Sequence, residues 1–135
     1  MLIDADTTRK NLKAILERQE EITPINVSKG LRERFKEACE HEGFKKFSTV
    51  LEDLIGQVNE SYFESEKKLK IELEGFDDRA TSSMSCESKT WKSFKEGCSK
   101  NRLKVGDVIE SIMVDYISQV EKSHKIKISN GKVKK

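Results

Sequence analysis

The chain has 135 residues, of which 26 are Lys or Arg and 24 are Asp or Glu, giving a formal net charge of +2. Charged residues make up 37% of the sequence and hydrophobic residues 35%, so any core is thin and a large doubly wound enzyme fold is disfavoured. The sequence begins without the basic start and apolar run of a signal peptide, and no apolar stretch approaches the roughly 18 residues that cross a bilayer. We therefore expect a small cytoplasmic protein without a membrane partner.

The first predicted element is an amphipathic helix in the N-terminal segment, residues 1–21. Leu12, Ile15 and Leu16 fall on one narrow face of a helix over residues 7–21. Such a face either packs on the rest of the domain or forms a surface for self-association or protein docking. The sequence leaves both alternatives open.

A short strand and a helix are predicted at the start of residues 22–62. Residues 23–28 alternate, with Ile25 and Val27 on the inner face, which is typical of a half-buried strand. Ser28 then stands where a helix N-cap belongs. An apolar stripe at helical spacing follows it, so we expect an amphipathic helix after the strand.

The same stretch continues with a helix end, a turn and a second helix. Gly43 predicts the end of the first helix, because glycine accepts a positive φ. Lys45 and Lys46 lie in the turn, and Ser48 is a plausible cap for the second helix. The apolar positions that predict this second helix are Val50, Leu51, Leu54, Ile55, Val58 and Tyr62.

This order of elements returns in residues 82–121, after a linker at residues 63–81. The segment FKEAC at 35–39 recurs as FKEGC at 94–98, an offset of 59 that becomes 58 after a one-residue deletion in the following turn. The second strand is predicted over residues 82–86. A unit of about 40 residues cannot bury its apolar face alone, so we expect the two copies to pair through their strands.

Residue types that support chemistry are scarce. Cys39, Cys86 and Cys98 have neither C-x-x-C nor metal-ligand spacing, so we expect no disulfide framework and no zinc site. His41 and His124 have no partners at ligand spacing. No nucleophile with an adjacent base and no phosphate loop is found, so we expect no enzyme activity and no cofactor.

The matched pairs Phe35 with Phe94 and Cys39 with Cys98 fall on helical core positions, so we expect them to be buried. The basic C-terminal tail, residues 122–135, carries six Lys and no acidic residue. Such a block is either a solvated terminus or an arm that attracts nucleic acid.

The two copies resemble the ribbon-helix-helix family of DNA-binding proteins, the group that includes the MetJ and Arc repressors. The residues that carry the resemblance are the strand ending in Val27 and Ser28, then Leu31, Phe35, Gly43, Phe44 and the run from Ser48 to Leu51. Two copies in one chain are similar to the TraY-type plasmid transfer proteins. The resemblance implies a mainly α fold with a short two-stranded β-ribbon, in which tandem ribbon-helix-helix repeats form an intramolecular pseudo-dimer.

The resemblance also implies that the ribbon enters the major groove of double-stranded DNA. Base contacts would then be made by Pro24, Asn26, Ser28, Ser83 and Ser85. Phosphate contacts would be made by Lys45, Lys46, Ser48, Thr49, Arg102, Lys104, Gly106 and Asp107. Asn26 is the strongest candidate reader, because its amide can both donate to and accept from adenine.

The function that this resemblance implies is sequence-specific binding of duplex DNA, by a transcriptional repressor or a plasmid or phage DNA-processing accessory factor. The alternative is a protein-interaction module that has the fold and does not read DNA. The outward positions predicted for the ribbon contain no Arg, Lys or Gln, which favours this alternative.

Overall fold

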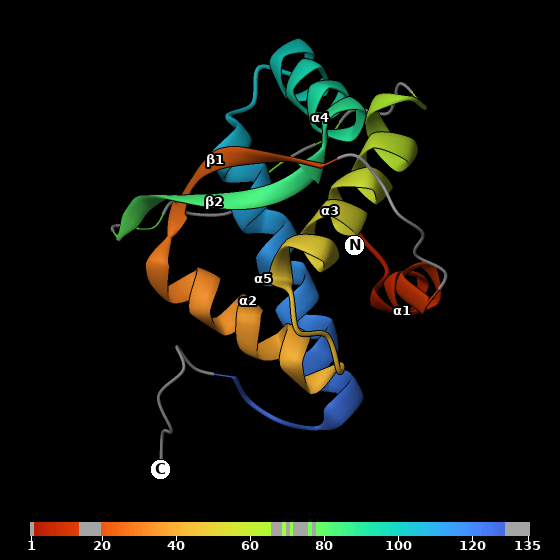
Figure 1. The fold of residues 1–135 in the computed structure, drawn as a ribbon, viewed down its shortest axis with the longest axis vertical. Helices are drawn as coiled ribbons and strands as arrows, with labels where there is room; N and C mark the ends of the chain where they lie inside the picture. The colour runs from red at the N-terminus through yellow and green to blue at the C-terminus, as the bar shows by residue number, and fades with distance from the viewer. Residues whose placement is uncertain are drawn as a thin grey trace.

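The protein is described by a computed structural model that covers residues 2–13, 20–65, 69, 71, 76 and 78–128. It is mainly helical with one two-stranded antiparallel sheet, as the sequence predicts (Figure 1). In chain order the elements are α1 (Ala5–Lys13), β1 (Glu20–Ser28), α2 (Lys29–His41), α3 (Phe47–Val58), the π-helical turn η1 (Asn59–Phe63), β2 (Arg79–Glu87), α4 (Ser88–Lys100) and α5 (Val105–His124). Within the described ranges, no helix is long and apolar enough to span a membrane.

The two strands pair over their whole length, and Pro24 lies opposite Ser83 at the centre of the ribbon. Each strand begins three residues before its predicted start, at Glu20 and at Arg79. Backbone pairing needs no apolar side chains, so the alternating pattern marks only the part of each strand that covers the core. In that part the prediction is confirmed, since the inner side chains are buried: Ile25, Val27, Met84 and Cys86.

The strand and first helix of one half match those of the other half in length and position, and the second helices match at their starts. The repeat offset of 59 places both ends of β1 on those of β2 and both ends of α2 on those of α4. The offset of 58 places the start of α3 on the start of α5. The one-residue difference lies in the turn between the two helices, where the sequence predicts it. We call residues 20–63 the first unit and residues 79–124 the second unit.

The first helix of each unit ends in the same way. Gly43 has φ of 88° and Arg102 has φ of 56°, and both follow the helix by two residues. Beyond them, the Phe44 N–H donates to the Cys39 carbonyl and the Leu103 N–H donates to the Cys98 carbonyl, each at 2.9 Å. This is the Schellman pattern that ends helices at a left-handed residue. The predicted helix end at Gly43 is therefore confirmed.

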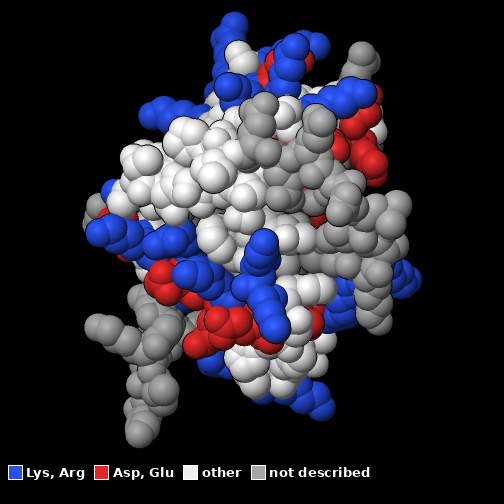
Figure 2. Space-filling view, in the orientation of Figure 1, with Lys and Arg blue, Asp and Glu red and all other residues white. Residues whose placement is uncertain are grey.

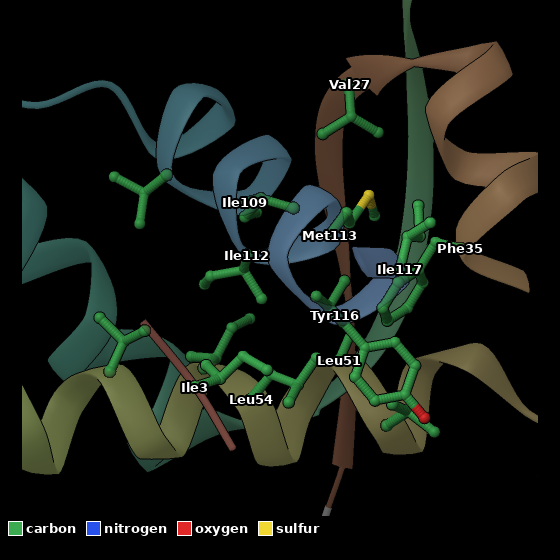
Figure 3. Close-up of a cluster of buried hydrophobic side chains, with 14 of the residues drawn as sticks. Ile3, Val27, Phe35, Leu51, Leu54, Ile109, Ile112, Met113, Tyr116 and Ile117 are labelled. Carbon is green, nitrogen blue, oxygen red and sulfur yellow. The ribbon is translucent and has the colours of Figure 1, made fainter. Parts of the chain in front are cut away.

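The core is shared between the units. α2 of the first unit packs on α5 of the second, while α3 packs on β2 and α4. Figure 3 shows side chains from β1, α2, α3 and α5 meeting in one cluster, with Val27, Phe35, Leu51 and Met113 among them. The matched pairs predicted for the core are fully buried, as expected: Phe35, Phe94, Cys39 and Cys98. Separating the units would therefore expose the interior of both.

The N-terminal helix begins before its predicted start and does not reach its predicted end at residue 21. α1 begins at Ala5 and is described to Lys13, whereas residues 20 and 21 belong to β1 and not to a helix. α1 packs against α3 and α5 of its own chain. The buried Thr8 hydroxyl donates to the Asp53 carboxylate at 2.7 Å. Ile15 and Leu16 of its predicted apolar face lie outside the described residues, and so does the side chain of Leu12.

The beginning of the predicted basic tail belongs to the folded body. α5 continues to His124, so the second helix extends beyond the predicted boundary at residue 121. Ile128 is buried, its N–H donates to the Glu121 carboxylate at 2.8 Å, and its carbonyl accepts from Arg34 at 3.2 Å. Lys122, Lys125 and Lys127 are exposed, and residues 129–135 lie outside the described residues, so a nucleic-acid-attracting arm stays a prediction.

Candidate nucleic-acid interface

The outer face of the ribbon carries uncharged side chains across its central part, residues 22–26 and 81–85. The exposed side chains there are Ile22, Pro24, Asn26, Thr81 and Ser83, and Ser85 is half-buried beside them. Figure 2 shows a white area on this side of the molecule, with both basic and acidic side chains around its margin. Four of the five residues predicted to contact bases therefore lie on this one surface.

Ser28 is the exception among the predicted base-contacting residues. It is only 1% exposed, and its hydroxyl accepts a hydrogen bond from the Leu31 N–H at 3.1 Å. The chain turns from strand into helix at this position, so the side chain caps α2 and cannot extend from the ribbon. The predicted N-cap is confirmed, and Ser28 is removed from the candidate surface.

Ile22 and Thr81 belong to the exposed face although the sequence analysis did not select them. Each lies two residues before a predicted outer position, Ile22 before Pro24 and Thr81 before Ser83. The period of two that identified Pro24 and Ser83 would have found them, had the strands been extended toward the N-terminus.

The second helices of both units begin beside the ribbon. The Ser85 N–H donates to the Ser48 hydroxyl of α3 at 3.2 Å. At the start of α5, a Cβ atom added to Gly106 would lie 2.6 Å from the Asn26 carbonyl oxygen, so only glycine fits there. Both helix N-termini are therefore held close to the strand backbones.

Ser48 is not the cap that the sequence predicts. α3 begins one residue earlier, at Phe47, and Lys46 occupies the N-cap position without a side-chain hydrogen bond to the helix. The Ser48 hydroxyl instead accepts a hydrogen bond from the Ser85 N–H of the ribbon. Lys104, which matches Lys46 in the repeat, occupies the same position before α5, and both lysines are exposed.

The remaining residues predicted to contact phosphate differ in accessibility. Lys45 and Arg102 are exposed in the two turns, and Thr49 is half-buried. Asp107 is half-buried and forms an ion pair with Arg79 from the start of β2. Because Arg79 compensates the Asp107 carboxylate, this acidic residue repels phosphate less than its sequence position suggests.

Arg79 belongs to a network that holds the ribbon to α5. Its Nε lies 3.1 Å and 3.2 Å from the two carboxylate oxygens of Glu110, a residue with no exposed surface. The same carboxylate accepts the Ser28 N–H at 2.8 Å. The hydrogen bonds that Arg79 donates to Glu110 and Asp107 raise its pKa above the ordinary value. This guanidinium is therefore a structural group rather than a free cation.

The first unit has a matching buried carboxylate. Glu52 of α3 is 3% exposed and accepts a hydrogen bond from the Glu87 N–H at the end of β2. Glu52 and Glu110 occupy matching positions of the repeat, and each binds the last residue of the other unit's strand. The sequence analysis did not select either residue. The repeat offset of 58 places one glutamate on the other, and this match could have identified them.

The flank of the molecule is less suited to an anion than the ribbon. A hollow of about 350 Å³ between α3 and α4 is lined by Glu60, Glu64 and Glu87, with Lys89 as the one basic residue among the described residues that line it. Such a concentration of carboxylates repels phosphate.

Comparisons with protein-family models, with curated proteins and with solved structures give no match for this chain. Its function is therefore inferred from the ribbon and the two helix N-termini.

Proposed function

We propose that this chain is a sequence-specific duplex DNA-binding protein of the ribbon-helix-helix type, which acts as a transcriptional repressor or a DNA-processing accessory factor. The observation that carries the proposal is the exposed two-stranded ribbon, flanked on both sides by helix N-termini with an exposed lysine at each cap, Lys46 and Lys104. The major groove of B-DNA is wide enough to admit such a ribbon.

The flanking groups suit phosphates on either side of a groove. A helix N-terminus presents unpaired N–H groups and the positive end of the helix dipole. The exposed ammonium groups of Lys46 and Lys104 would add an attraction that weakens with salt, because phosphate binding releases counterions. The ribbon would then meet the base edges between these two contacts.

The matched element bounds support a pseudo-dimer within one chain. Pro24 and Ser83 face each other at the centre of the ribbon, and the repeat offset of 59 relates the same two residues. An approximate twofold axis through this pair would relate the two units. A DNA site bound by such a protein would be an imperfect palindrome, since the units differ in sequence.

The test is a selection from randomised duplex DNA with the full chain at about 150 mM salt, where nonspecific phosphate attraction is weakened. We expect enrichment of one short, imperfectly palindromic site. If no sequence is enriched while circular dichroism shows a folded protein, the proposal fails. The alternative of a protein-interaction module would then take its place, and the exposed Ile22 would be its first candidate contact.

Base reading is tested separately by Asn26→Ala. We expect this variant to lose about 1 to 3 kcal/mol of discrimination at one base pair, because the amide no longer pairs with adenine. Ser93→Ala, at an exposed position of α4, is the matched control and should leave the preference unchanged. If Asn26→Ala and the unmodified chain show the same base preference at every position of the site, Asn26 does not contact a base.

Phosphate binding is tested by Lys46→Gln and Lys104→Gln. We expect each variant to weaken binding to all sequences alike and to reduce the salt slope by about one. Lys95→Gln removes an exposed charge from α4 and is the control. A salt slope that changes equally in all three variants would mean that only net charge matters.

A further inference from the structure

The exposed face of the ribbon is different at its two ends. On one side of the central Pro24–Ser83 pair, Ile22 lies opposite Ser85, and on the other side Asn26 lies opposite Thr81. The repeat offset of 59 relates Ile22 to Thr81 and Asn26 to Ser85. An approximate twofold axis would therefore relate the hydrocarbon side chain of Ile22 to the hydroxyl side chain of Thr81. It would relate the amide of Asn26 to the hydroxyl of Ser85. The two ends cannot make the same contacts.

Ile22 is 80% exposed, and it is the one exposed large hydrophobic residue in the described part of the chain. Water around this side chain is released only if an apolar group covers it. In the major groove, the apolar group on a base edge is the 5-methyl of thymine. The other base edges present donors and acceptors, which isoleucine would leave without a hydrogen-bond partner.

Asn26 has the opposite chemistry at the other end of the ribbon. Its exposed amide can accept from N6 and donate to N7 of adenine. Asn26 follows Ile22 by four positions, which is roughly 13 Å along a strand. This spacing corresponds to about four base-pair steps of 3.4 Å. The two side chains would thus meet bases in different halves of one site.

We infer that the two ends of the ribbon read two different half-sites: Ile22 contacts the 5-methyl group of a thymine in one, and the Asn26 amide pairs with an adenine in the other. This inference rests on the proposed DNA-binding function. It implies that the two half-sites differ, so the protein binds its DNA site in one orientation. It also makes Ile22 a specificity-determining residue.

The experiment uses the enriched duplex and replaces its thymines one at a time with deoxyuridine, which keeps every hydrogen bond and removes the methyl group. With the unmodified chain we expect one replacement to weaken binding about fourfold, the equivalent of one methylene-sized group. Ile22→Ala should bind the thymine and deoxyuridine duplexes equally, whereas Ile22→Val should keep most of the difference.

Asn26→Ala provides the matched comparison. It should keep the full sensitivity to the thymine methyl and lose only the preference for adenine in the other half-site. Ile22→Ala should show the reverse pattern. Because both side chains are exposed, we expect both variants to stay folded, and circular dichroism checks this.

The outcomes separate the inference from the proposed function. If a site is enriched and Ile22→Ala is as sensitive to the methyl group as the unmodified chain, the inference is wrong and the DNA-binding proposal stands. Enrichment of a perfect palindrome also overturns the inference. If no site is enriched by the folded protein, the inference fails together with the proposed function.

Discussion

At the end of the first helix, one unit has glycine and the other has arginine in the same backbone conformation. Gly43 and Arg102 both have positive φ, at 88° and 56°. For a residue with a Cβ atom this left-handed conformation costs roughly 1 to 2 kcal/mol. The hydrogen-bonded turn therefore determines the conformation, and the second unit retains a strained residue that also supplies a positive charge.

We predict that Gly43→Ala destabilises the protein by about 1 kcal/mol, because alanine disfavours positive φ. Gly56→Ala, in the interior of α3, should instead stabilise it by about 0.5 to 1 kcal/mol. An added Cβ meets nothing within 4 Å at either position, so backbone conformation alone distinguishes them. Urea denaturation measures both changes. Effects of the same sign would contradict the assigned conformation at Gly43.

Buried carboxylates are a second feature at the scale of single residues. Glu110 has no exposed surface and accepts hydrogen bonds from Arg79 and from the Ser28 N–H. A buried carboxylate is tolerated only when such donors compensate its lost hydration. This residue therefore links the end of β1 and the start of β2 to α5.

We expect Glu110→Ala to lower the free energy of unfolding by about 3 kcal/mol, because it leaves the buried Ser28 N–H without its acceptor and removes one of the two carboxylates that Arg79 binds. Glu110→Gln should cost less, since its amide oxygen can still accept the Ser28 N–H. Chemical denaturation of the two variants provides the measurement. A cost below about 1 kcal/mol for the alanine variant would show that the carboxylate is not a structural contact.

At the scale of elements, one side chain joins three helices. Glu42, at the end of α2, accepts a hydrogen bond from Arg9 of α1 at 2.5 Å and lies 2.7 Å from Nε2 of His124 in α5. Burial by itself would raise the pKa of Glu42, but the hydrogen bonds with Arg9 and His124 outweigh it. They hold this pKa below the ordinary value of 4.5.

Because the pKa of Glu42 is lower in the folded state, the ionised carboxylate stabilises the fold above the ordinary value of 4.5. This contribution is lost as the pH falls through the folded-state pKa. We predict that Glu42→Gln is less stable than the unmodified chain by about 1 to 2 kcal/mol at neutral pH. The difference should shrink as the pH is lowered below 4.5 in parallel urea titrations. A difference that is constant with pH would exclude the carboxylate as its source.

The elements themselves were predictable to different degrees. The helices after each strand follow from a one-sided apolar stripe, and Gly43 indicated where the first one ends. The outer parts of the strands, from Glu20 and from Arg79, carried no such pattern, because they are held by pairing rather than by burial. Ser48 had the chemistry of a cap, yet the nearby ribbon backbone binds its hydroxyl.

At the scale of the whole molecule, the core belongs to both units at once. α2 packs on α5 and α3 on α4, so neither unit has a complete interior of its own. A structure of this kind loses its packing in both units when either one opens. We therefore expect a single cooperative unfolding transition.

The three buried cysteines report on this cooperativity, because Cys39 lies in the first unit and Cys86 and Cys98 lie in the second. Burial raises the pKa of Cys98 to about 12 and that of Cys39 further, so neither thiol is reactive in the folded protein. We predict that all three react with a thiol reagent at one common rate, at least about a thousandfold slower than in the unfolded chain. Mass spectrometry of the labelled peptides measures each rate. Earlier labelling of one unit would show that the units open separately.

The sequence by itself determined the repeat, the order of its elements and the side of each element that is buried, because periodicity records burial locally. It also indicated the outer ribbon positions Pro24, Asn26 and Ser83. Only the tertiary structure decided which unit packs on which, that Ser28 turns inward, and that Glu52 and Glu110 bind the strand ends. These features depend on distances between residues far apart in the chain, which no local pattern of residues contains.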